Sequence, residues 1–305
     1  MRAFISSMDA RRRWQFSTYM TVAPSTNLNQ GSDKSIVLLN GIPFLLGERN
    51  VKHAGVGIAT GLQGGYFHPL SESVDLVTSV GLHVKRYKQS EFNDTIGSIS
   101  LGPRWRTDRG FVGLHGLAET RQIEDADYFK SWGILLSTGY SLSAQNIVFG
   151  DFSCSKRSFD ENWRGSNLEY WNGHACSVNG RFEHHLDSRT YVRALGGIGR
   201  ENTGRDHLDN RYYSGGLGVY RELPTGVSLY LQALYTKRVY LGDYPGLMER
   251  RDDDRYDLSV NVIKRDLHIF GLAPMLQYTY TINKSNVEFL AFDAHGVSLT
   301  MTKKF

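Results

Sequence analysis

The chain has 305 residues, of which 40% are hydrophobic and 22% are charged, and its formal net charge is +4. No stretch approaches the ~18 consecutive apolar residues of a membrane-spanning helix, which excludes a helical membrane protein. The basic residues are scattered singly and form no basic helix or compact patch, so the sequence gives no support to nucleic-acid binding.

Apolar and polar residues alternate from near the amino terminus to the end of the chain. In one segment Leu76, Val80 and Leu82 share a face, while Ser79 and His83 lie on the other. The same pattern runs through residues 14–22, 74–84, 132–142, 227–238, 256–262, 272–282 and 295–305. A period of two over about ten residues is typical of tilted strands that cross a membrane.

The connections between these segments alternate between short turns and other loops, most of them longer. Short turns are expected at 68–73, 107–110, 143–145, 187–189, 224–226 and near 265–266, and loops at 24–54, 90–93, 124–127, 159–167, 203–210, 241–253 and 283–293. Tight turns at one end and wider loops at the other are the arrangement of outer-membrane barrels. We count about 14 strands, and an even number places both termini on the periplasmic side.

The face opposite the apolar one carries Asp, Lys, Arg, Gln and many Gly, which a dry sandwich core cannot accommodate. We therefore expect an all-β protein, namely a transmembrane antiparallel up-and-down β-barrel that contacts outer-membrane lipid and encloses a wet lumen. Such a protein must be exported, yet residues 1–16 lack the apolar core and the cleavage site of a signal peptide.

The segment 24–54 is long and mixed in polarity, with apolar stretches at 36–39 and 42–46. Two arrangements stay open: a loop folded into the lumen, where it narrows the barrel, and a loop that stands outside.

Catalytic and cofactor sites find no support in the sequence. No HExxH, GxSxG or paired-carboxylate motif occurs, and the ten histidines fit lumen-lining or solvated positions better than a triad. The glycine clusters at 196–199 and 215–218 do not join a strand to a helix, as a nucleotide-binding loop requires. We expect no enzyme activity, cofactor or metal.

Three further features allow two interpretations each. Cys154 and Cys176 flank one loop, and free thiols are favoured over a disulfide because the geometry of a direct cross-strand bond is restrictive. The charge run 249–255 is interpreted as a solvated loop base rather than an ion-pair cluster. Four of the five tryptophans and the many tyrosines are expected in interfacial girdles; these tryptophans are Trp105, Trp132, Trp163 and Trp171.

The chain resembles the carboxyl-terminal barrel of the surface lipoprotein assembly modifiers, an outer-membrane family of Gram-negative bacteria. Short matching pieces carry the resemblance, in order, at 23–29, 39–44, 66–70, 86–87, 93–94, 101–105, 221–226, 250–253, 271–274, 283–286 and 302–305. The motif positions, which we expect to serve the structure or a client path, are Asn27, Asn29, Gly41, Pro43, Tyr87, Asp94, Pro103, Trp105, Arg251, Asp253, Pro274, Ser285, Asn286 and Phe305.

The resemblance implies a periplasmic repeat domain before the barrel, with residues 1–12 as its residual tail and 13–305 as the barrel. It also implies a translocator that helps to deliver lipoproteins, or secreted haem- or metal-binding proteins, to the cell surface. The client path is the lumen or the seam between the first and last strands. The terminal Phe305 resembles the signal that the barrel assembly machinery recognises. The alternative is a general diffusion porin or nutrient channel.

Overall fold

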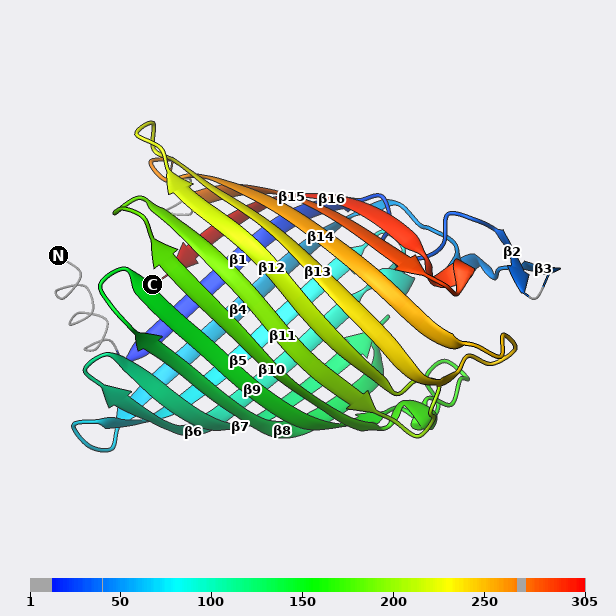
Figure 1. The fold of residues 1–305 in the computed structure, drawn as a ribbon, viewed down its shortest axis with the longest axis horizontal. Helices are drawn as coiled ribbons and strands as arrows, with labels where there is room; N and C mark the ends of the chain where they lie inside the picture. The colour runs from blue at the N-terminus through cyan, green and yellow to red at the C-terminus, as the bar shows by residue number, and fades with distance from the viewer. Residues whose placement is uncertain (1–12, 40, 268–272, 305) are drawn as a thin grey trace.

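A closed antiparallel barrel of fourteen strands forms the body of the protein (Figure 1). The structure, a computed structural model, describes residues 13–39, 41–267 and 273–304. The barrel strands are β1 (Trp14–Ser25), β4 (Gly55–Pro69), β5 (Val74–Tyr87), β6 (Asp94–Thr107), β7 (Gly110–Ile123), β8 (Ala126–Ser141), β9 (Asn146–Phe159), β10 (Gly173–His185), β11 (Thr190–Asn202), β12 (Asn210–Glu222), β13 (Val227–Asp243), β14 (Arg250–Lys264), β15 (Ala273–Ser285) and β16 (Phe292–Lys304). The predicted fold class and strand number are confirmed.

Each strand pairs with its neighbours in sequence, and β1 closes the barrel by pairing with both β4 and β16. Short 3-10 turns occupy four of the connections: η1 (Glu48–Asn50), η2 (Ser90–Phe92), η3 (Glu169–Trp171) and η4 (Glu288–Leu290). No helix within the described ranges is long and apolar enough to cross a bilayer.

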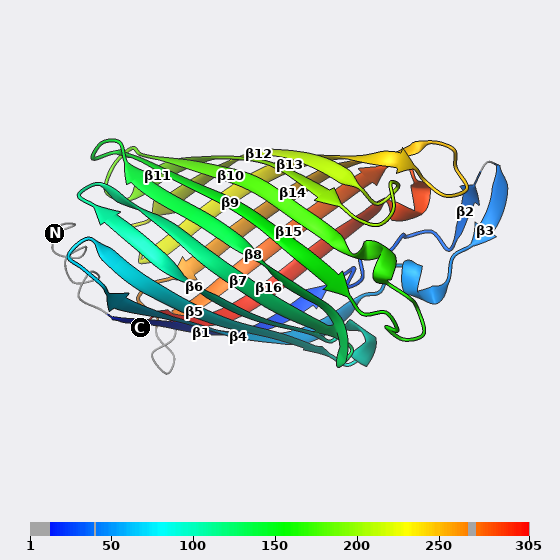
Figure 2. The ribbon, with the colours of Figure 1, turned by 90° about the horizontal axis from the view of Figure 1, so that it is seen from below.

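The two ends of the barrel differ, as the connection lengths predicted. Ser17 pairs with Lys304, so β1 begins and β16 ends at the end that carries the short turns. The segment between β1 and β4 lies at the opposite end, which we call the loop end (Figure 2). Several strands run further than expected: β13 and β14 leave only 244–249 between them, not 241–253.

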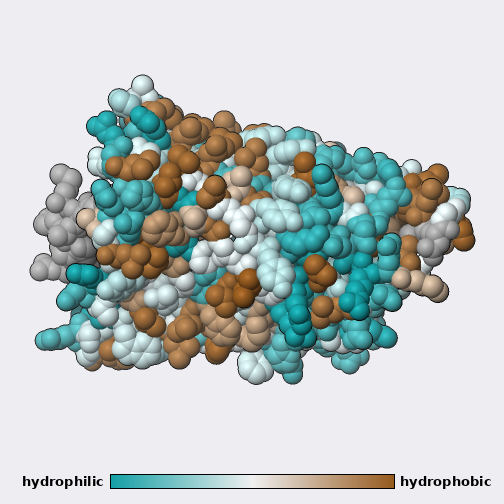
Figure 3. All heavy atoms as spheres, viewed as in Figure 1, coloured by the Kyte–Doolittle hydropathy of each residue, from teal (hydrophilic) through white to brown (hydrophobic). Residues whose placement is uncertain are grey.

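The alternating sequence separates the two faces of the wall. Outward positions are apolar and exposed, as at Ile198 (54%) and Leu217 (69%), because lipid rather than protein covers them. Figure 3 shows hydrophobic residues over the middle of the wall and hydrophilic ones toward the loop end. Trp105 and Trp132 are exposed on the outer wall, as expected of girdle residues, whereas Trp163 and Trp171 lie in the loop between β9 and β10.

Glycines on the lumen side make room for tyrosine rings from the neighbouring strand. A Cβ added at Gly61 would lie 2.1 Å from the ring of Tyr19, and one at Gly57 would lie 2.2 Å from the ring of Tyr87. Gly61 and Tyr19 are direct register partners, as are Gly57 and Tyr87. Each ring therefore covers the bare backbone opposite it, which fixes the register of these strands.

The segment between β1 and β4 contains a hairpin, β2 (Ile36–Leu39) paired with β3 (Ile42–Leu45). In Figures 1 and 2 this hairpin stands beyond the loop end of the barrel, whereas residues 28–30 and 48–53 of the same segment lie at the mouth of the lumen. Gly41 at its tip has φ +80°, a left-handed conformation that glycine adopts without strain. The side chains Val37 on β2 and Val287 beside η4 are both buried, so the hairpin is docked rather than free.

A disulfide joins Cys154 on β9 to Cys176 on β10, with Cα atoms 4.1 Å apart. The favoured prediction of free thiols is therefore wrong. The two residues are direct register partners on adjacent strands, a placement that the sequence did not fix. Ile134 of β8 is the register partner of Cys154 on its other side and is exposed on the outer wall. The disulfide therefore lies on the outer face of the barrel.

The disulfide yields a first prediction. The untreated protein takes up no alkylating reagent when it is unfolded, and two equivalents after reduction, as measured by mass. Replacing both cysteines with serine lowers the free energy of unfolding by about 2–4 kcal/mol, because the denatured chain loses a cross-link. Urea titration in detergent measures this change. Alkylation of the unreduced chain would contradict the bond.

A second prediction concerns the two faces of β12. Leu217→Arg places a charge against lipid and destabilises the barrel by about 2–4 kcal/mol in vesicles. Ser214→Arg, on the lumen side of the same strand, costs less than about 1 kcal/mol, because water solvates the new charge. Equal losses in the two variants would rule out a wet lumen.

Candidate functional site

A cavity of about 830 Å³ opens at the loop end of the lumen. It is lined by the segment between β1 and β4, by the loop-end residues of β5 to β7, and by the loop between β9 and β10. Asp94, at the start of β6, accepts two hydrogen bonds from Arg121 of β7, at 2.9 and 3.0 Å. Across the mouth, Arg164 pairs with Glu124. The cavity wall is thus built from paired charges, and two-pronged arginine–carboxylate contacts hold its geometry.

A second ion pair lies on β14, where Arg251 binds Asp253 at 3.0 and 2.6 Å and its guanidinium stacks on the Tyr240 ring. Asp253 is only 4% exposed. Arg255 in the same way binds Asp257. The charge run 249–255 is therefore not a solvated loop base. Alternation along a strand places Arg251, Asp253 and Arg255 on one face, where they form ion pairs.

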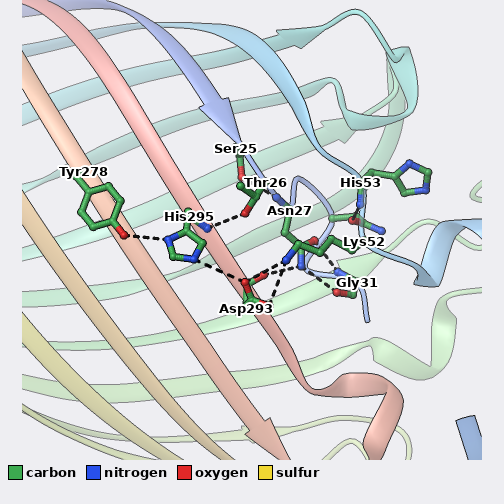
Figure 4. Close-up of polar contacts among 10 residues, drawn as sticks. Ser25, Thr26, Asn27, Gly31, Lys52, His53, Tyr278, Asp293 and His295 are labelled. Atoms are coloured by element: carbon green, nitrogen blue, oxygen red, sulfur yellow. Dashed lines mark hydrogen bonds and ion pairs between the residues drawn. The ribbon is translucent and has the colours of Figure 1, made fainter. Parts of the chain in front are cut away.

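Two asparagines organise the segment that follows β1. Asn29 donates to the backbone oxygens of Arg49 and Val51 and accepts from the amide of His53. Asn27 is buried and donates to the oxygens of Gly31 and Asp293, both at 2.9 Å. Because Asp293 belongs to β16, Asn27 connects this segment to the last strand (Figure 4).

The β1–β16 seam carries further polar contacts at its loop end. Lys52 pairs with Asp293 at 3.0 Å, and the amide of His295 donates to Thr26 Oγ1. The imidazole of His295 in turn contacts the Tyr278 hydroxyl at 2.9 Å (Figure 4). We call the contacts of Asn27, Lys52 and Asp293 the seam latch.

Below the latch, strand pairing along the seam is interrupted. The register is continuous from Val22–Leu299 to Ser25–Gly296, but the ladder skips Ala23 and Pro24 between these pairs. Proline has no N–H to donate, so this stretch of the seam carries fewer hydrogen bonds than a regular ladder. Further along, the hydroxyls of Thr21 and Thr300 meet at 2.7 Å in the lumen.

The hairpin is held to the loop between β15 and β16. Lys34 pairs with Glu288, and the amide of Leu38 donates to the Glu288 carboxylate at 3.3 Å. The hydrogen bond from Lys34 lowers the pKa of Glu288, and the same bond raises the pKa of Lys34. The hairpin also exposes apolar side chains, namely Ile36, Leu38, Ile42, Phe44 and Leu45.

The predicted motif positions separate into groups. Eight lie at the loop end: Asn27, Asn29, Tyr87, Asp94, Arg251, Asp253, Ser285 and Asn286. Gly41 and Pro43 belong to the hairpin, while Pro103, Trp105 and Pro274 lie near the turn end. Phe305 and residues 1–12 lie outside the described residues.

Of these positions, Asn29, Tyr87 and Asp94 line the cavity, and Asn27 alone takes part in the seam latch. Asn286 accepts from the amide of Asp252 and so fastens the β15–β16 loop to β14.

Sequence reasoning missed Lys52, Arg121, Glu288 and Asp293. Each acquires its role from a partner far along the chain, and no local pattern marks such a pair. Within the described part of the chain, no cluster of three or more His, Cys, Asp or Glu side chains is arranged to hold a metal ion.

Comparison with known proteins assigns the chain to a family. The model of the family described as "Surface lipoprotein assembly modifier" matches residues 14–305. The chain belongs to the surface lipoprotein assembly modifier family. Family membership and the closed barrel place it in the outer membrane of a Gram-negative bacterium.

Two curated relatives match parts of the chain. The "Hemophilin secretion modulator" of Acinetobacter baumannii is 22% identical over 218 residues, which cover 70% of this chain and 42% of that protein. "Surface lipoprotein assembly modifier 1" of Haemophilus influenzae is 33% identical over 109 residues, 35% of this chain and 22% of that one. The match thus spans less than half the length of either relative.

Among solved structures, a loop-deletion mutant of OmpT, an outer-membrane protein of Vibrio cholerae, aligns with a TM-score of 0.53 at 10% identity. The alignment covers 96% of this chain and 99% of that one. At this identity the likeness establishes the barrel fold alone.

The Glu288 contacts yield a third prediction. Because docking of the hairpin favours the ionised carboxylate, docking is complete above the ordinary pKa of glutamate, about 4.3. It weakens as the pH falls through the lowered value. We expect hydrogen-exchange protection of the Leu38 amide to fall by about two- to fivefold between pH 7 and pH 3, after correction for intrinsic rates.

Glu288→Gln gives the same loss already at pH 7 and removes the pH dependence. The matched control is Glu48→Gln, in the segment between β1 and β4 that carries the hairpin, and it leaves protection unchanged. A pH response that persists in Glu288→Gln would assign the effect to another group.

Proposed function

We propose that the protein is an outer-membrane translocator that assists the delivery of client lipoproteins, or secreted haem- or metal-binding proteins, to the cell surface. Membership of the surface lipoprotein assembly modifier family carries the proposal. The names of the two relatives, which mention surface lipoprotein assembly and hemophilin secretion, point the same way. The role is non-enzymatic, and it needs no cofactor.

In this proposal the loop end faces the outside and the turn end the periplasm, where residues 1–12 continue from a repeat domain. The assembly machinery for barrels recognises the terminal Phe305, and bilayer lipid covers the apolar wall. These assignments follow from the length of the connections and from the family.

We place the client path along the β1–β16 seam. Two observations support this choice. The ladder skips Ala23 and Pro24, and the loop end of the seam is held by side-chain contacts that can be exchanged. A seam that opens exposes two strand edges, which pair with extended client backbone.

The hairpin supplies a first contact for the client. It stands outside the barrel with exposed apolar side chains. Among the described strands β3 pairs only with β2, so its other edge is open. Exposed apolar patches in water commonly mark interaction surfaces. Gly41 and Pro43 serve this surface by forming the tip and by limiting strand pairing on β3.

A fourth prediction tests the seam. In a Cys154→Ser/Cys176→Ser background, Thr21→Cys/Thr300→Cys forms a disulfide that locks β1 to β16. The two hydroxyls already lie 2.7 Å apart. Surface labelling of a co-expressed, epitope-tagged candidate lipoprotein then falls at least fivefold, and reductant restores it.

The matched control is Ser153→Cys/Ser177→Cys in the same background. These residues are also opposite each other, with hydroxyls 3.0 Å apart, but they join β9 to β10. This lock leaves surface labelling unchanged. An equal loss of surface labelling in both locked variants would contradict a client path along the seam. An unchanged surface signal after deletion of the whole gene would contradict the translocator function itself.

The alternative function is a general diffusion porin or nutrient channel, which the polar lumen favours. Planar-bilayer recordings distinguish the two. A porin conducts steadily and its conductance ignores any client, whereas a translocator responds to the presence of its client.

A further inference from the structure

The outer face of β9 to β12 carries a basic rim near the loop end. It consists of Lys156, His174, Arg200 and Arg211, all of them exposed. Lys156 lies directly opposite His174 in the β9–β10 register, and Arg200 lies directly opposite Arg211 in the β11–β12 register. The guanidinium groups of Arg200 and Arg211 are like charges in directly opposed positions, which destabilise a sheet.

No carboxylate of the described part of the chain pairs with the cations of this rim. Among the described residues, none of Lys156, Arg200 and Arg211 forms an ion pair with Asp or Glu, although Arg200 donates to the amide oxygen of Asn202 at 2.7 Å. The lumen arginines differ, since Arg121 and Arg193 bind Asp94 and Glu183. The cations of the basic rim therefore have no carboxylate partner, whereas these lumen arginines do.

Below the basic rim, the apolar wall is hollowed by glycines. Gly150, Gly180, Gly196 and Gly215 are successive register partners across β9 to β12. A Cβ at Gly215 would meet nothing within 4 Å, and at the other three the nearest atoms lie at 3.4 to 4.0 Å. Unlike Gly57 and Gly61 in the lumen, which tyrosine rings cover, these four leave open space on the lipid side.

The hollow continues into a groove of about 660 Å³ over β11 to β15. Its floor includes Ala194, Gly215 and Ala233, and its walls include Leu217 and Tyr235. Gly196 and Gly215 lie four residues from Arg200 and Arg211, about 13 Å along the strand. One molecule with an anionic head and several hydrocarbon chains can therefore occupy both the basic rim and the groove.

We propose that this face binds a phosphorylated, multiply acylated glycolipid of the outer leaflet, of the lipid A type. Its phosphates contact the basic rim, where arginine forks match phosphate oxygens. Its acyl chains fill the groove. The Cys154–Cys176 disulfide lies in the same row, with Cys176 directly opposite Arg200, and holds two of the four strands in place. The choice of leaflet rests on the proposed orientation, while the binding site is independent of client transport.

The test uses the full chain refolded in detergent and native mass spectrometry. The probes are bis-phosphorylated lipid A, its dephosphorylated form and phosphatidylglycerol. We expect bis-phosphorylated lipid A to bind at least tenfold more tightly than either of the others. Lys156→Gln/Arg200→Gln/Arg211→Gln weakens its binding at least tenfold.

The charge-matched control is Arg109→Gln/Arg189→Gln/Arg221→Gln, at the turn end of the barrel, which changes affinity less than twofold. Gly196→Val/Gly215→Val fills the groove without touching a charge and weakens binding several-fold, with folding verified by heat-dependent gel mobility. Equal loss in both arginine-containing triples would overturn the site, as would equally tight binding of dephosphorylated lipid A. Equally tight binding of phosphatidylglycerol would overturn the assignment to lipid A.

Discussion

Every backbone N–H and C=O that enters the hydrocarbon region must find its partner within the protein, and a closed sheet is how strands satisfy this requirement. Closure by β1 between β4 and β16 leaves the barrel no free edge. It also makes the β1–β16 seam the one place where ladder pairing depends on the two ends of the barrel sequence. The interruption at Ala23 and Pro24 falls on that seam, where the polar contacts around Asn27 and Asp293 compensate from the loop end.

The same alternation gives the two faces different chemistry. On the lumen side, water solvates charged side chains, and arginines form ion pairs with carboxylates, as Arg121 does with Asp94. On the lipid side, exposed leucine and isoleucine side chains carry no structural cost, because hydrocarbon replaces water. Glycine has opposite meanings on the two faces. In the lumen, Gly57 and Gly61 make room for a neighbouring tyrosine ring. On the outer wall, an added Cβ at Gly196 or Gly215 would meet no protein atom closer than 3.9 Å.

The fold was predictable because a period of two survives in nearly every strand, and connection lengths distinguished the two ends of the barrel. Strand ends were less predictable. β14 begins within a dense charge run, where a hydrophilic sequence was mistaken for a loop although its charges are paired across one face. The disulfide required the register of β9 against β10, which no local pattern encodes.

The candidate site was predictable only in part, for a related reason. Family motifs marked Asn27 and Asn29, but these side chains donate to the backbone oxygens of Asp293 and Val51. Every residue has a backbone oxygen, so the sequence does not show which one is the acceptor. Glu288 is an ordinary exposed glutamate until the hairpin docks against it. Contacts of this kind depend on the pairing register of every strand around the barrel. The sequence therefore predicted the strands of the wall better than the side-chain contacts at the loop end.

The hydrogen bond from Asn27 to Asp293 spans 266 positions of the chain. It cannot exist until nearly all of the polypeptide has been delivered to the membrane, so it forms after the thirteen hairpin-like neighbour pairings have had the opportunity to assemble. The amino-terminal strand must therefore wait, with one edge unsatisfied, for the last strand to arrive. A truncated product that lacks Asp293 and the residues after it cannot form this contact, so the loop end of its seam stays incomplete.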